Sequence, residues 1–134
     1  MGKEVASCFI IDEQDRFLIV RRSETDWWRP FHWEIPGGKI DDTDSTANHA
    51  AIREVQEETG LELIQCRFME LYKSERITKF YFTSRWWIGD IRIPITQENG
   101  IIEHDAYKWA SIDDLKSQED LIIPVEVFER ALTK

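Results

Sequence analysis

Residues 53–61 read REVQEETGL, and this stretch places three carboxylates, Glu54, Glu57 and Glu58, within five positions. On a helix, Glu54 lies three residues before Glu57 and four before Glu58, so the three side chains share or border one face. Like charges about 6 Å apart cost roughly 3 kcal/mol per pair at an effective dielectric near 20, before salt screening. A divalent cation would remove this repulsion, whereas the alternative is a solvated acidic helix face.

The residues before this stretch extend the helix and supply a loop. Small and apolar residues recur at helical spacing from Ser45 to Thr59, and Gly60 stands where a left-handed C-cap belongs. Upstream, Trp33–Gly38 reads WEIPGG, a loop that can bring a backbone carbonyl to the same cation. All the available ligands are hard oxygens, which favours Mg²⁺ or Mn²⁺ over zinc.

The rest of the chain alternates strands with helices. We expect two strands joined as a hairpin, further strands, a short run near the end and a final helix that starts at Pro124. Their ranges are Val5–Ile11 and Phe17–Arg21 for the hairpin, Glu62–Tyr72 and Thr78–Trp87, Ala106–Ala110, and Pro124–Leu132. This order predicts an α+β fold, an α/β/α sandwich with a mixed central sheet, in one domain over residues 1–134.

Composition narrows the class of protein. The chain has 134 residues, 42% of them hydrophobic, and 26 acidic against 17 basic residues give a net charge of −9. That charge disfavours stable binding to nucleic acid or to an anionic membrane. Neither a membrane span nor a signal peptide is readable, and Cys8 and Cys66 have no CxxC partner. We therefore expect a cytoplasmic protein with both thiols reduced.

Residues 38–61 resemble the Nudix box, whose pattern is GX5EX7REUXEEXGU with U aliphatic. The second half matches at Arg53, Glu54, Val55, Glu57, Glu58, Gly60 and Leu61. The first half departs, because the expected glutamate falls on Asp44 when counted from Gly38 and on Ser45 when counted back from Arg53. One residue is inserted there, and either Asp44 or Ser45 can cap the helix.

The resemblance implies roles for these residues. Glu57, Glu58 and the Gly38 carbonyl would bind Mg²⁺ or Mn²⁺, Glu54 would be a further ligand or a base acting on water, and Arg53 would orient the glutamates. The implied reaction is hydrolysis of a nucleoside diphosphate derivative. Accessory motifs of other subgroups are missing, which favours a MutT-like enzyme that converts a nucleoside triphosphate to monophosphate and pyrophosphate.

Alternatives to that reaction stay open. They are hydrolysis of a nucleotide sugar or dinucleoside polyphosphate, a catalytically weak nucleotide-binding or regulatory domain, and an interaction module without turnover. Dimers are common in the resembled family, so a homodimer is a further expectation.

Residues outside the box complete the predicted site. Glu103 is the candidate for an additional catalytic acid, with an exposed loop acid as the equal alternative, and His104 is expected to be a surface or loop histidine rather than a ligand. Trp28 and Trp33 adjoin the glycine loop and are candidates for stacking on a base, although core packing is typical of most tryptophans. Arg22, with Arg21 and Arg29 nearby in sequence, is the candidate for meeting substrate phosphates, although a hairpin edge often carries such charges without function.

Overall fold

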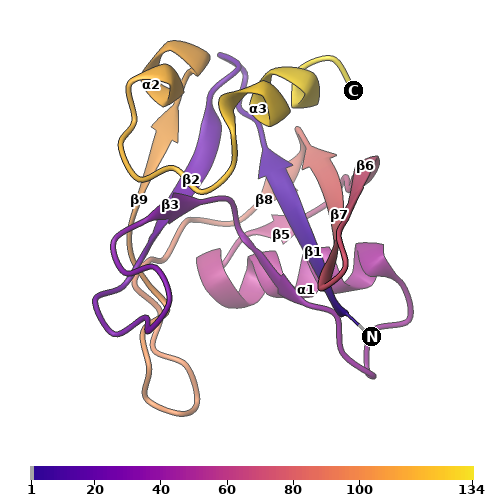
Figure 1. The fold of residues 1–134 in the computed structure, drawn as a ribbon, viewed down its shortest axis with the longest axis vertical. Coiled ribbons are helices and arrows are strands. Elements are labelled where there is room, and N and C mark those ends of the chain that lie inside the picture. The colour runs from indigo at the N-terminus through magenta and orange to yellow at the C-terminus, as the bar shows by residue number, and fades with distance from the viewer. Residues whose placement is uncertain (1) are drawn as a thin grey trace.

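The computed structural model describes residues 2–134, which form nine strands and three helices (Figure 1). The strands are β1 (Lys3–Ile10), β2 (Phe17–Arg22), β3 (Trp33–Glu34), β4 (Gly37–Lys39), β5 (Glu62–Leu63), β6 (Arg67–Lys73), β7 (Ile77–Ser84), β8 (Trp87–Ile88) and β9 (His104–Ala110). The helices are α1 (Ala47–Thr59), α2 (Ile112–Lys116) and α3 (Val125–Ala131). No helix in this part of the chain is long and apolar enough to cross a membrane.

The strands form one mixed and two antiparallel sheets. The largest has the order β4-β1-β7-β6, in which β1 and β7 run parallel and the other pairs run antiparallel. A second sheet has the order β3-β2-β9, and β5 pairs with β8. The α+β class and the mixed sheet predicted from the sequence are confirmed.

The predicted hairpin is wrong in its pairing, although both of its strands exist. β1 and β2 lie in different sheets and share only the bridge between Ile11 and Phe17. β1 pairs instead with β7, far along the chain, and β2 pairs with β9. A short polar turn indicates that two strands are neighbours, but long-range burial decides which edges pair.

Both faces of the strands are covered, as an α/β/α sandwich requires. Along β1, Ala6, Cys8 and Ile10 belong to a buried cluster with α1, whereas Phe9 belongs to a cluster with α2 and α3. Phe128 of α3 meets Phe9 and Phe17 edge-on, with ring centroids 5.1 Å apart in each pair. Figure 1 shows α1 on the opposite side of the strands from α2 and α3.

The N-cap of helix α1 is not one of the two predicted residues, Asp44 and Ser45, but the residue that follows them. Thr46 is the N-cap, and its hydroxyl accepts a hydrogen bond from the backbone N–H of His49 at 3.1 Å. Asp44 and Ser45 therefore do not cap the helix, which corrects that prediction. The helix ends at Gly60 with φ of 83°, the left-handed conformation expected of a glycine C-cap.

Near the C-terminus, the structure contains one helix that the sequence did not predict. α3 follows Pro124, which occupies the N-cap position, and β9 begins at His104, two residues before the predicted strand. Helix α2 was not predicted. Ser111 and Asp114 cap it reciprocally, and this Ser-x-x-Asp spacing is the signal that could have revealed it.

Candidate active site

Two glycines bring the β3–β4 segment against α1. Gly37 pairs with Ser7 of β1, and a Cβ on Gly37 would lie 2.6 Å from the carbonyl oxygen of Ala6. A Cβ on Gly38 would lie 2.5 Å from the Glu54 carboxyl carbon. A side chain at Gly37 would clash with the backbone of β1 and push the strand away, whereas one at Gly38 would displace the Glu54 carboxylate.

Arg53 gathers the acids on one side of this contact. Its guanidinium donates to Asp44 at 2.8 and 2.9 Å, to Glu54 at 2.9 Å and to Glu57 at 3.1 Å. It also donates to the carbonyl of Lys39 at 3.1 Å, which ties α1 to β4. We call Arg53, Asp44, Glu54 and Glu57 the Arg53 cluster. In it, Asp44 takes a structural role in the box's first half by pairing with Arg53 rather than by capping the helix.

The hydrogen bonds and burial in the Arg53 cluster shift the pKa values of two of its carboxyl groups. The hydrogen bonds from Arg53 are the largest influence on Asp44 and hold the pKa of that carboxyl well below its usual range. Burial raises the pKa of Glu54, and the neighbouring Arg53 only partly opposes this. Glu57 is half-exposed, with 49% of its side chain accessible. The cluster thus presents one half-buried and one accessible carboxylate at the same surface.

Glu58 lies on the buried side of α1. The residue is only 4% exposed, and its Oε2 accepts a hydrogen bond from the backbone N–H of Gly37 at 3.0 Å. Burial raises the pKa of Glu58 well above its ordinary value, and the charges of Glu34, Glu54 and Glu103 raise it further. A buried carboxyl in so negative a setting fits a site that a cation completes.

Glu34 and His104 surround Glu58, and the sequence reading had missed both. His104 lies with Nδ1 3.2 Å from Oε1 of Glu58 and Nε2 2.7 Å from Oε2 of Glu34. The predicted surface position of His104 is wrong, since the residue is 6% exposed. We call Glu58, Glu34, His104 and Glu103 the Glu58 cluster. No local signal links Glu34 with His104, because seventy positions separate them.

Glu103 joins this cluster from the loop before β9. Ligand atoms of Glu58, Glu103 and His104 all lie within 4.8 Å of one another, so these groups are spaced to share one ion. Glu103 itself is exposed, and its backbone carbonyl accepts from the N–H of Ser23. The structure therefore brings Glu103 to the box helix from a distant part of the chain.

Of the predicted substrate-binding residues, Arg22 and Trp28 lie beside the Glu58 cluster. Arg22 donates to both oxygens of Glu34 at 3.0 and 3.1 Å and also pairs with Asp26, so its charge is engaged within the protein. The Trp28 ring is 50% exposed and lies 5.3 Å from the Arg22 guanidinium carbon. The Trp33 ring lies 4.6 Å from Nζ of Lys108. Trp28 is thus linked to the carboxylates through Arg22, whereas Trp33 packs against the core cluster of α2 and α3 and does not reach them.

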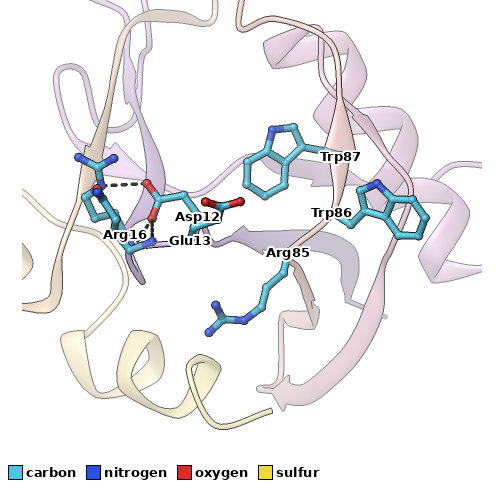
Figure 2. A pocket seen from close by; sticks show the side chains of 7 residues that line it. Asp12, Glu13, Arg16, Arg85, Trp86 and Trp87 are labelled. Atoms are coloured by element: carbon cyan, nitrogen blue, oxygen red, sulfur yellow. Dashed lines mark hydrogen bonds and ion pairs between the residues drawn. The ribbon is translucent and has the colours of Figure 1, made fainter.

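A separate hollow of about 560 Å³ opens beyond the far end of β1 (Figure 2). Figure 2 shows Trp86 and Trp87 at one side of it and Asp12, Glu13 and Arg16 at the other. Arg16 pairs with Asp12 at 2.8 Å, and Arg85 pairs with Asp15 at 3.0 Å. The hollow contains none of the box residues, and its two arginines are engaged with aspartates. The carboxylate site is therefore the better candidate for chemistry on a phosphate compound.

The donor set suits a hard divalent cation. Glu54, Glu57, Glu58 and Glu103 offer carboxylate oxygens on and beside α1, Gly38 approaches the Glu54 carboxylate, and His104 adds a ring nitrogen near Glu58 and Glu103. Arg53 is shared among Asp44, Glu54 and Glu57, and Arg22 pairs with Glu34 and Asp26, so neither arginine forms an ion pair with Glu58 or Glu103. The acids thus outnumber the local cations, and the residues fit Mg²⁺ or Mn²⁺.

Comparison with known proteins identifies the family of this chain. The profile of the NUDIX domain family matches residues 1–130. The chain belongs to the NUDIX family. An 8-oxo-dGTP diphosphatase of Proteus vulgaris is 30% identical over 91 residues, which are 65% of this chain and 80% of that protein. The predicted Nudix pyrophosphohydrolase, of the MutT-like type, is confirmed at the level of the family.

Other relatives carry more than one activity in their names. An 8-oxo-dGTP diphosphatase of Buchnera aphidicola is 33% identical over 86 residues, which are 63% of this chain and 59% of that protein. A bis(5'-nucleosyl)-tetraphosphatase of Rattus norvegicus is 30% identical over 86 residues, which are 62% of this chain and 58% of that protein. The match thus spans less than two thirds of the length of these last two proteins. These relatives are named for different substrates.

Solved structures show the same fold. A MutT protein from Methanosarcina mazei superposes with a TM-score of 0.76 at 24% identity, covering 99% of this chain and 96% of that one. The NUDIX domain of Shewanella oneidensis NrtR, in complex with ADP ribose, gives a TM-score of 0.78 at 17% identity, covering 99% and 88%. At these identities the likeness concerns the fold alone.

Proposed function

We propose that this NUDIX protein is a metal-dependent pyrophosphohydrolase that converts a nucleoside triphosphate to a monophosphate and pyrophosphate. The observation that carries the proposal is the surplus of carboxylates around α1, where Glu58 is buried among other acids and, within residues 2–134, forms no ion pair with a lysine or arginine. Such a surplus raises the free energy of the metal-free protein, and binding of a divalent cation would relieve it.

We assign the cation to Glu54, Glu57, Glu58 and the Gly38 carbonyl. A bound Mg²⁺ or Mn²⁺ would offset the negative charge of the diphosphate and activate water for attack on phosphorus. Arg53 holds the Glu54 and Glu57 carboxylates through hydrogen bonds of 2.9 and 3.1 Å, which fixes their direction before substrate arrives. Glu54 is either a ligand or the base that removes a proton from the water, and Glu103 is the additional acid.

The nucleoside is assigned to the side where Trp28 lies, and Trp33, which packs against the α2 and α3 core, remains the second candidate. Trp28 is half-exposed and close to Arg29 as well as Arg22, so a base stacked there would meet an aromatic face and positive charge together. Arg22 acts here by holding Glu34, and phosphate contact with Arg22 would require release of its ion pairs.

Two further substrate classes have specific support. The relatives named for 8-oxo-dGTP favour an oxidised purine triphosphate, and the rat relative favours a dinucleoside polyphosphate. A nucleotide sugar is a further alternative. A nucleotide-binding domain without turnover is the alternative from another class, and the presence of all four box residues, Arg53, Glu54, Glu57 and Glu58, argues against it.

The test is a substrate panel with resolved phosphate products. Nucleoside triphosphates, 8-oxo-dGTP, dinucleoside tetraphosphates and nucleotide sugars are incubated with Mg²⁺, with Mn²⁺ and with chelator. We expect monophosphate plus pyrophosphate from a triphosphate only when metal is present, and Glu57→Gln serves as the matched inactive control. Binding of nucleotide and metal without any product would overturn the enzyme proposal in favour of a binding domain.

The remaining expectations concern context. A homodimer stays a prediction that sedimentation of the purified chain would test, and a cytoplasmic location stays a prediction for fractionation of cells.

A further inference from the structure

We propose that His104 is a positioning residue that fixes the Glu58 carboxylate for cation binding, and that Glu34 in turn fixes His104. The inference rests on the proposed function, since it takes Glu58 to be a ligand of the cation. It adds two residues, Glu34 and His104, that lie outside residues 38–61.

Both oxygens of Glu58 already have partners from different strands. Gly37 of β4 donates its backbone N–H to Oε2 at 3.0 Å, and Nδ1 of His104 on β9 lies 3.2 Å from Oε1. The carboxylate is therefore held across three elements, because Glu58 itself stands on α1. A carboxylate held at both oxygens offers its remaining lone pairs in one fixed direction, which is how outer residues tune a metal ligand.

The opposite nitrogen of the His104 ring is held as firmly. Nε2 lies 2.7 Å from Oε2 of Glu34, whose other oxygen lies 3.0 Å from Nη1 of Arg22. Arg22 also pairs with Asp26 in the loop after β2. The result is a chain of contacts, Asp26–Arg22–Glu34–His104–Glu58, that runs from a surface loop to the box helix.

This geometry favours positioning over ligation by the histidine itself. The ligand atoms of His104, Glu58 and Glu103 are close enough to share an ion. Each ring nitrogen, however, already faces a carboxylate oxygen, so ligation would require His104 to give up one of these contacts. The ring is also only 6% exposed, which leaves it little room to turn.

Amide variants of His104 separate its two contacts. The side-chain nitrogen of asparagine occupies nearly the place of Nδ1, and that of glutamine nearly the place of Nε2. His104→Asn thus keeps a donor toward Glu58, whereas His104→Gln keeps one toward Glu34. The measurements are the Mn²⁺ dissociation constant by electron paramagnetic resonance, kcat and KM with the best substrate, and Tm.

We expect His104→Gln to raise the Mn²⁺ dissociation constant about 10- to 100-fold and to lower kcat to a similar degree, with KM within about threefold of the wild type. His104→Asn should stay within about fivefold of the wild type in both quantities. Glu34→Ala keeps the ring and removes its anchor, and should weaken Mn²⁺ binding by about 3- to 10-fold. His49→Gln on the outer part of α1 is the matched control and should change nothing.

Three outcomes would overturn the inference. One is equal loss of Mn²⁺ affinity in the Asn and Gln variants, and another is a lowered Tm in both with Mn²⁺ affinity unchanged. The third is nitrogen hyperfine coupling from His104 to bound Mn²⁺, which would make the histidine a ligand. A graded Mn²⁺ affinity without hydrolysis would support positioning and contradict only the proposed function, whereas a wild type that binds no Mn²⁺ would contradict both.

Discussion

The two charge clusters on α1 are built from the same kind of residue and balanced in opposite ways. In the Arg53 cluster one guanidinium contacts Asp44, Glu54 and Glu57, so most of the negative charge has a partner at 2.8–3.1 Å. In the Glu58 cluster the buried carboxyl has one backbone N–H and one histidine, and three other acids raise its pKa beyond the effect of burial. The difference indicates that Arg53 and Asp44 stabilise the fold and hold Glu54 and Glu57 in place, whereas the second cluster keeps an excess of negative charge that favours a cation.

Removing the charge of a proposed metal ligand should have the largest effect on activity. Glu58→Gln and Glu57→Gln should each lower turnover by at least about a hundredfold, because each removes a proposed metal ligand. Activity of Glu57→Gln within a few fold of wild type would remove that residue from the mechanism. Steady-state kinetics with saturating Mg²⁺ would measure the effect.

The thermal stability of Glu58→Gln should differ from that of the wild type in a way that depends on pH and metal. The pKa of Glu58 is raised on folding, so its charge opposes folding at pH values above its unfolded pKa near 4.5. Metal-free Glu58→Gln should therefore unfold at the same or a higher Tm than wild type at pH 7–8, with the advantage lost below about pH 4.5. Added Mg²⁺ should raise Tm of the wild type only. A clear fall in Tm for the metal-free variant at pH 8 would contradict a cluster strained by surplus charge.

Removing the Arg53 guanidinium from the Arg53 cluster should lower the free energy of unfolding. Arg53→Ala would leave the Asp44 carboxylate, whose side chain is fully buried, without its main partner. We expect a loss of about 2–4 kcal/mol in the free energy of unfolding by urea, with a smaller loss for Arg53→Lys, which keeps the charge but not the fork of donors. Equal stability of the Ala and Lys variants would show that hydrogen-bond geometry, and not charge, carries the effect.

Asp44 allows the same cluster to be tested by pH. Arg53 holds the pKa of Asp44 well below its ordinary value of 3.8, so this carboxylate stabilises the fold above pH 4 and loses that contribution as pH falls toward the lowered pKa. Asp44→Asn should have a lower Tm than wild type at pH 7, and the difference should narrow at pH 3 and below. A difference that does not change with pH would mean that Asp44 acts through shape alone.

The parts of the site that were predictable are those set by local spacing. The helix, its Gly60 cap, the glycine approach and the acids around Arg53 lie within residues 33–61, where three- and four-residue periods place side chains on one face. The pairing of β1 with β7, the burial of His104 and its contact with Glu34 were not predictable, since each depends on residues about seventy positions apart meeting in the folded chain. Asp44 lies between these cases. Its position was marked as irregular by the inserted residue, and its partner Arg53 appeared only in three dimensions.

Glu103 tests the difference between the two clusters with the smallest expected effect, because it belongs to the Glu58 cluster yet remains exposed. Water screens an exposed carboxylate, and its loss leaves Glu54, Glu57, Glu58 and the Gly38 carbonyl for the cation. Glu103→Gln should therefore lower kcat by about tenfold, less than Glu57→Gln, and should leave Tm nearly unchanged. A loss larger than that of Glu57→Gln would make Glu103 the principal base and move the centre of the chemistry from α1 to the loop before β9. Intermediate loss with weaker Mn²⁺ binding would instead identify Glu103 as a ligand on the outer side of the ion, consistent with its position within 4.8 Å of Glu58 and His104.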